Sequence, residues 1–172
     1  MKISVRASRI THHAFTLIEL ILVLALLVVM AALTLPRMSG FVQGRALDSE
    51  ARRLLALMHG TQSRAVSEGM PMMLWVDEQA GTYGAEAETS GQNGDPKAEE
   101  LTVDANLQLA VTPVGTGPQI TFKNLPAIRF LPDGTVDEGS LPTLKLTDKA
   151  GVSRWLVEAG NHQGYEIDDS GK

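Results

Sequence analysis

The hydrophobic pattern divides the chain into an apolar stretch near its start, an amphipathic stretch after it, and a long region of short alternating runs. Residues 15–35 are apolar at all but three positions, and no charged residue occurs from residue 20 to residue 36. A helix that crosses a membrane needs about 20 mostly apolar residues. The pattern therefore predicts a transmembrane helical segment over residues 15–36.

Residues 37–69 have a helical pattern of a different kind. Apolar residues such as Leu47, Leu54 and Met58 recur at helical spacings, and charged residues fall between them. This periodicity places the apolar side chains on one face of an amphipathic helix. Gly69 is followed by a proline two residues on, which is a stop signal for a helix. We expect Pro36, between the two helical segments, to kink the helix or melt it locally.

Residues 70–172 favour β structure, because short runs of alternating apolar and polar residues are separated by turn residues. We expect strands near residues 72–76, 81–83, 107–111, 119–122, 127–131, 144–146, 155–157 and 165–167. Residues 84–100 contain few apolar residues and predict a long surface loop. Trp75 and Trp155 are expected in the core. A helix followed by antiparallel hairpins gives an α+β fold, with the long N-terminal helix packed on an antiparallel sheet.

Glu19 is out of place in the apolar stretch. An ionised side chain at membrane depth is costly, so such residues are functional hypotheses by default. The alternative is a side chain that snorkels from the end of the helix to the membrane surface.

Charge is distributed unevenly along the chain. Residues 1–14 contain three basic residues and no acid, whereas residues 37–172 contain 12 Lys and Arg and 19 Asp and Glu, a net charge of 12 − 19 = −7. Nucleic-acid binding depends on Lys and Arg that neutralise phosphates. The acidic balance of the soluble part therefore argues against a nucleic-acid partner.

The sequence lacks the residues and motifs that would indicate an enzyme. It contains no cysteine, which excludes disulfides, thiolate metal sites and cysteine nucleophiles. It also lacks the common motifs of hydrolases, zinc peptidases and nucleotide-binding proteins. We therefore expect no catalytic residue, no metal site and no cofactor.

Three readings fit the first 36 residues. The first is an ordinary cleaved secretory signal, although the apolar stretch is longer than the usual ~7–15 residues. The second is an uncleaved signal anchor, which fits the length but does not explain Glu19. The third is a leader of residues 1–14 that is cut between Ala14 and Phe15, so that the apolar stretch becomes the first helix of the mature chain.

The third reading rests on a resemblance. The sequence Phe15-Thr16-Leu17-Ile18-Glu19-Leu20 resembles the prepilin cleavage and methylation motif of type IV pilins and type II secretion pseudopilins. The resemblance implies that a prepilin peptidase/N-methyltransferase cuts before Phe15 and methylates its amino group. It also implies that Glu19 makes an assembly contact with that amino group, in its own or a neighbouring subunit. The family has glycine before the cut, where this chain has Ala14.

A second resemblance lies in the β-rich region. The order Ile128-x-Phe130-x-Pro132-x-Gly134, then Leu144-x-Leu146, Trp155-x-Val157 and Gly164, is similar to the C-terminal domain of GspH/FimT-type minor pseudopilins. It implies a pilin-like fold, with residues 70–172 as a periplasmic domain. The implied partners are other pseudopilins in a helical filament, the prepilin peptidase and the inner-membrane secretion platform.

These resemblances imply a minor pseudopilin of a type II secretion system, in or at the tip of the pseudopilus, that helps to export folded proteins. The implied location is the bacterial inner membrane, spanned once, with a cytoplasmic N-terminus. A minor pilin of a type IV pilus or a DNA-uptake system is the alternative. A membrane-anchored periplasmic enzyme or ligand-binding domain is a third possibility, of another class.

Overall fold

The structure is a computed structural model that describes residues 16–89, 94–112 and 117–170, with the side chains of residues 33–43 outside the description. One helix, α1, runs from Leu17 to Glu68. Nine strands follow it in the described part of the chain. The chain forms two compact units, residues 1–39 and 40–172, and each is considered by itself below.

Within the second unit, α1 buries one face. Leu47, Leu54, Met58 and Ala65 are at most 1% exposed, as their helical spacing predicts. Val66 also fits the apolar pattern but is 53% exposed, so the buried face is narrower than the sequence indicates. The helix ends at Gly69, whose φ of 64° lies in the left-handed region that favours glycine after a helix.

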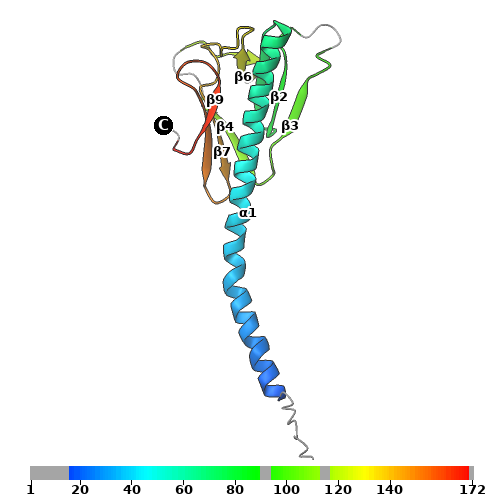
Figure 1. Cartoon of the computed structure of the whole chain (residues 1–172), viewed down its shortest axis with the longest axis vertical. Helices are drawn as coiled ribbons and strands as arrows, with labels where there is room; N and C mark the ends of the chain where they lie inside the picture. The colour runs from blue at the N-terminus through cyan, green and yellow to red at the C-terminus, as the bar shows by residue number, and fades with distance from the viewer. Residues whose placement is uncertain (1–15, 90–93, 113–116, 171–172) are drawn as a thin grey trace, which may run out of the picture. The chain divides into compact units, whose positions relative to one another are not determined.

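The strands form two antiparallel sheets. The first has the order β3-β2-β1-β6-β5 and the second the order β4-β7-β8-β9. In Figure 1, the part of α1 within this unit runs along both sheets, with β2 and β3 on one side and β4, β7 and β9 on the other. The strands are β1 (Met72–Asp77), β2 (Thr82–Ala87), β3 (Glu99–Thr102), β4 (Leu107–Thr112), β5 (Thr121–Phe122), β6 (Leu125–Phe130), β7 (Thr143–Asp148), β8 (Ser153–Glu158) and β9 (Tyr165–Asp168).

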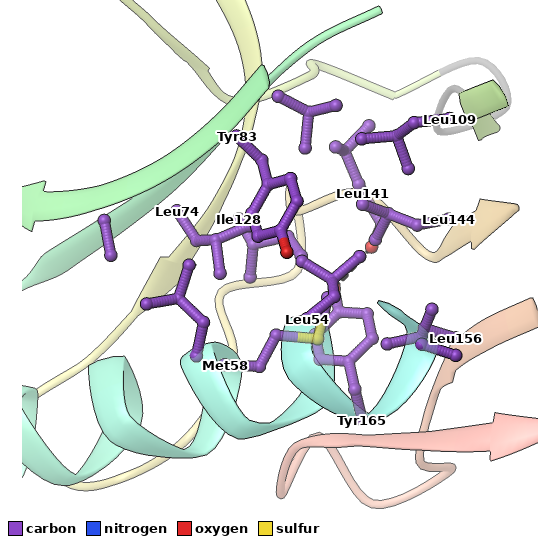
Figure 2. Close-up of a cluster of buried hydrophobic side chains, with 14 of the residues drawn as sticks. Leu54, Met58, Leu74, Tyr83, Leu109, Ile128, Leu141, Leu144, Leu156 and Tyr165 are labelled. Carbon is purple, nitrogen blue, oxygen red and sulfur yellow. Dashed lines mark hydrogen bonds between the residues drawn. The ribbon is translucent and has the colours of Figure 1, made fainter. Parts of the chain in front are cut away.

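One apolar core joins α1 to both sheets. Leu74 lies opposite Ala85 on one side and Ile128 on the other, so the three residues share the sheet face that packs on the helix. Figure 2 shows side chains from α1, from the first sheet and from the second sheet pointing toward one another. Full burial of such a side chain stabilises the fold by about 1.5–3 kcal/mol. The part of α1 from residue 40 to residue 68 is therefore an integral part of the domain.

Polar contacts fix the position of α1 on the strands. The hydroxyl of Tyr83 donates to Oε1 of Glu50 at 2.8 Å, and both residues are buried. Burial, with the neighbouring Glu50 carboxylate as a second cause, raises the pKa of the Tyr83 phenol. The amide nitrogen of Gln62 donates to the carbonyl oxygens of Gly134 at 2.6 Å and Gln163 at 2.8 Å. Glu50 thus binds the helix to the first sheet, and Gln62 binds it to two turns.

The expected loop over residues 84–100 is wrong at both ends. Residues 84–87 are buried in β2, and β3 begins at Glu99. Residues 84–87 contain few large apolar side chains because they accommodate Trp75. Gly84 leaves room for the ring of Trp75, and Glu86 accepts a hydrogen bond from its indole nitrogen at 3.2 Å. Residues 90–93 of the expected loop lie outside the described residues.

The two tryptophans have different environments. Trp75 is buried as expected, but in a separate cluster with Met73 and Ala127 on the face of the first sheet that points away from α1. Trp155 is only half-buried and lies opposite Lys145, whose Nζ is 5.5 Å from the ring centroid. The expectation that Trp155 belongs to the core is therefore wrong. It packs under a lysine on the outer face of the second sheet.

Acid is expected to loosen the segment around Asp95. Burial by itself raises the pKa of Asp95, but hydrogen bonds from Lys97, Arg64 and Ala87 outweigh it, and the pKa lies below its ordinary value. A carboxylate of this kind stabilises the fold fully above its unfolded-state pKa of about 3.9, and the contribution is lost as the pH falls through the folded-state pKa. Below about pH 4, the Tm of the wild-type chain should therefore fall more steeply than that of Asp95→Asn. Thermal unfolding of both proteins in a pH series checks this, and parallel curves would contradict it.

Candidate assembly site on the N-terminal helix

The helix α1 begins at a hydrogen-bonded cap. Oγ1 of Thr16 accepts a hydrogen bond from the backbone N–H of Glu19 at 3.3 Å. The carbonyl oxygen of Thr16 accepts from the N–H groups of Glu19 at 3.1 Å and Leu20 at 3.2 Å. A threonine followed three residues later by a glutamate is the capping-box pattern. Thr16 is thus the N-cap residue, and Glu19 is the third residue of the helix.

This position gives Glu19 a local role that the sequence interpretation did not consider. The first turn of a helix has a partial positive charge, which a carboxylate stabilises. The signal was present in the sequence as Thr16-x-x-Glu19. The carboxylate of Glu19 therefore lies where it favours the start of the helix, and it lies close in the chain to the position of the predicted new amino terminus.

Apolar side chains surround the described N-terminal part of α1. They are 47–77% exposed, and they occupy most positions from residue 17 to residue 30 and so lie on every side of the helix: Leu17, Ile18, Leu20, Ile21, Leu22, Val23, Leu24, Leu26, Leu27, Val28, Val29 and Met30. Monomeric soluble proteins rarely expose contiguous apolar surface of this extent, and such patches mark membrane or protein contacts. This surface is therefore suited to be covered by lipid or by the apolar helices of other subunits.

The predicted membrane segment is only partly within the described residues. In the part that the structure describes, no helix is long and apolar enough to cross a membrane. Phe15 and the side chains of residues 33–36 lie outside the description. The segment over residues 15–36 stays a prediction.

The structure describes only some of the other predicted site residues. Ala14 and Phe15, the residues on either side of the predicted cut, both lie outside the described residues. The backbone is helical without interruption across Pro36, so the proline does not end the helix, and a kink there stays a prediction. Glu19 is exposed in the first helical turn.

No alternative centre emerges from the acidic and histidine side chains. Across residues 16–170, apart from residues 90–93 and 113–116 and the side chains of residues 33–43, no group of three or more such side chains is placed to hold a metal ion. The features that bear on function are therefore the exposed apolar surface of α1, the carboxylate in its first turn, and the domain fixed to its C-terminal half.

Comparison with known proteins gives consistent results. The family model for Type II transport protein GspH matches residues 50–161, which is 112 of the 172 residues. A Type II secretion system protein H from Xanthomonas campestris pv. campestris is 26% identical over 146 residues, which cover 84% of this chain and 76% of that protein.

Two solved structures share the fold. The minor pseudopilin EpsH of Vibrio cholerae is 17% identical with a TM-score of 0.55, over 76% of this chain and 98% of that one. The type IV minor pilin FimU of Pseudomonas aeruginosa PAO1 is 18% identical with a TM-score of 0.55, over 77% of this chain and 95% of that one. Both similarities support a pilin-like α+β fold. Because the family model covers about two thirds of its residues, the chain belongs to the Type II transport protein GspH family.

Proposed function

We propose that the chain is a minor pseudopilin subunit of a type II secretion system, which assembles in or at the tip of the pseudopilus and helps to export folded proteins. The observation that supports this most directly is the exposed apolar surface of α1, with a carboxylate in its first turn, on a chain of the GspH family. Such a surface is stable only when lipid or other apolar helices cover it. A subunit that passes from a bilayer into a helical bundle meets this requirement, because lipid covers the surface before assembly and neighbouring helices cover it afterwards.

The geometry suggests how the subunit works. The apolar surface of α1 is buried among the helices of neighbouring subunits, and Glu50 and Gln62 hold the C-terminal part of α1 to the strands and turns of the domain. Glu19 pairs with the amino group that a cut before Phe15 creates. A buried charge persists when an opposite charge accompanies it, and removal of one partner typically costs about 3–5 kcal/mol. The cut and the methylation require a prepilin peptidase/N-methyltransferase, and assembly requires the inner-membrane platform.

The same fold suits a second candidate, a minor pilin of a type IV pilus or a DNA-uptake system. The similarity to FimU favours it, with the same TM-score as EpsH. The family match and the Xanthomonas relative favour secretion. An enzymatic role receives no support from a family described as a transport protein. Deletion of the gene separates the two assembly roles, because secretion should fail in one case and pilus formation in the other.

Mass spectrometry of the mature protein tests the processing step. We expect an N-terminus at Phe15 that bears an N-methyl group, because the motif places the cut after Ala14. The matched control is the same chain in a strain without prepilin peptidase, where the N-terminus should remain at Met1. A mature protein that begins at Met1 in the wild-type strain, or beyond Ala32, would contradict the prepilin interpretation.

A further inference from the structure

A hollow of about 560 Å³ lies between α1 and the outermost strand of the first sheet, β3. Its helical side includes Ala56 and Gly60, neither of which has a side chain larger than a methyl group. Leu57, Ala85 and Leu101 supply apolar lining. The hollow exists because small residues on the helix face a strand at the sheet edge.

Two arginines bridge α1 to the two ends of this strand region. Nη1 of Arg53 donates to the carbonyl oxygen of Thr102 at 3.3 Å, and Nη1 of Arg64 donates to the carbonyl oxygen of Lys97 at 3.1 Å. Arg64 also pairs with Asp95 at 2.9 Å and Glu68 at 3.2 Å, so its place is structural. Arg53 is held less firmly, because its side chain is 46% exposed and its carboxylate partner Glu50 is 3.6 Å away.

The outer edge of β3 has unused hydrogen-bonding groups. The strand pairs with β2 alone in the part of the chain that the structure describes. The N–H of Val103 bonds to the carbonyl of Gly81, so the alternation of an antiparallel ladder directs the backbone groups of Leu101 toward β2. The backbone groups of Glu100 and Thr102 therefore point outward. Only the carbonyl of Thr102 has a partner there among the described residues, namely Arg53.

We propose that β3 and the adjoining hollow form a docking site for an extended strand from another subunit of the same filament. The strand pairs with the outward backbone groups of Glu100 and Thr102 and places an apolar side chain in the hollow beside Leu101. In this mode of recognition, main-chain hydrogen bonds give affinity and side-chain pockets give specificity. The inference rests on the proposed function, because it names a contact within the filament.

Charge identifies the kind of strand that fits. Glu99 and Glu100 are both exposed on β3, and like charges directly opposite one another destabilise a strand pair. Two copies of this chain joined edge to edge would bring four glutamates together, which argues against a second copy as the occupant. A strand with a lysine or arginine opposite Glu100 is complementary, and the loosely held Arg53 can turn to one of its carbonyl groups.

A proline at position 100 tests the main-chain contact. Proline removes an N–H that points away from β2, and an edge strand tolerates proline when that side faces solvent. Glu100→Ala is the matched control, because it removes the carboxylate and retains the N–H. In cells that express the complete secretion system, we expect about tenfold less full-length Glu100→Pro in sheared pseudopili than wild type. The loss for Glu100→Ala should be only about twofold, because an exposed charge pair across two strands contributes little. Wild-type recovery of Glu100→Pro would overturn the proposal.

A second pair of variants keeps the test decisive if Glu100→Pro unfolds. Gly60 lines the hollow, and a Cβ there meets nothing within 4 Å, so the larger side chain of Gly60→Leu is placed to occupy the hollow. Ser63→Leu adds the same side chain to the exposed surface of α1, outside the hollow. Loss of Gly60→Leu from pseudopili, with Ser63→Leu retained, supports the proposal, and equal recovery of both overturns it.

Two further outcomes are distinguishable. Because the chain has no cysteine, Glu100→Cys offers a single site for cross-linking, and a product that joins two copies of this chain would overturn the assigned occupant. If the wild-type chain itself is absent from pseudopili, the proposed function fails. If the wild type and Glu100→Pro are both present in equal amounts, only the docking site fails.

Discussion

Replacement of Glu19 by alanine is expected to remove the chain from the pseudopilus and leave its folded domain intact. Without the carboxylate, the amino group of Phe15 would be buried among apolar helices with no opposite charge. Loss of one partner of a buried pair costs about 3–5 kcal/mol, which corresponds to roughly 10²–10⁴-fold less incorporation. The measurement is the amount of full-length chain in sheared pseudopili, together with the activity of a secreted enzyme outside the cell. Normal assembly of Glu19→Ala would contradict the pairing.

Two matched variants separate this pairing from the local role of Glu19 in the helix start. Glutamine serves as well as glutamate in a capping box, so Glu19→Gln keeps the cap and loses the charge. Thr16→Ala removes the N-cap, at about 1 kcal/mol, and keeps the carboxylate. If the charge matters, Glu19→Gln should fail as Glu19→Ala does, and Thr16→Ala should assemble. The reverse result would assign Glu19 to capping alone.

Replacement of Gly84 by alanine is expected to cause the largest loss of stability from a single methyl group. A Cβ at this position would lie 2.5 Å from the backbone oxygen of Glu99 and 2.5 Å from Cζ2 of Trp75. Neither neighbour can move easily, because one is the backbone of β3 and the other is a ring that is 8% exposed. Overpacking of this kind costs about 3 kcal/mol, or a fall in Tm of roughly 10 °C for a domain of this size.

Thermal unfolding of the full-length chain in detergent checks this prediction. Gly160→Ala is the control, since an added Cβ there meets nothing within 4 Å, and its Tm should match that of the wild type. A Gly84→Ala protein that unfolds at the wild-type temperature would show that β2 and β3 can separate without cost. The same measurement would then weaken the argument that β3 is a fixed edge to which another strand can add.

The fold could be predicted where the alternation of apolar and polar residues alone determined which residues are buried. Leu144 and Leu146 alternate with polar residues, and both are buried in β7 as a half-buried strand requires. The prediction was wrong where a strand residue also has to accommodate a side chain of the neighbouring strand. Gly84 and Glu86 look like loop residues, but they are small or acidic because Trp75 needs space and a hydrogen-bond acceptor. Such a contact between β1 and β2 depends on register, which a single sequence does not state.

The candidate sites were predictable to different degrees. The motif from Phe15 to Leu20 suggested the assembly contact through resemblance, and the helix cap could also have been found from Thr16-x-x-Glu19. The docking site beside β3 was not predictable. Its strand is short and acidic, and the adjoining hollow, which Ala56, Gly60 and Leu101 line, is formed only when α1 and β3 come together in the folded domain.

The attachment of α1 to both sheets has a mechanical consequence. Hydrogen bonds and ion pairs from Glu50, Gln62 and Arg64 leave the helix at different heights and end on different strands and turns. A force along the axis of this part of the helix would load these bonds and the core around Leu54 together, in shear. The contacts would then have to break at the same time and not one after another. The lifetime of the domain under such a load depends on its unfolding rate. Within residues 40–172, a force on this part of α1 is therefore shared by the core and by all of these contacts at once.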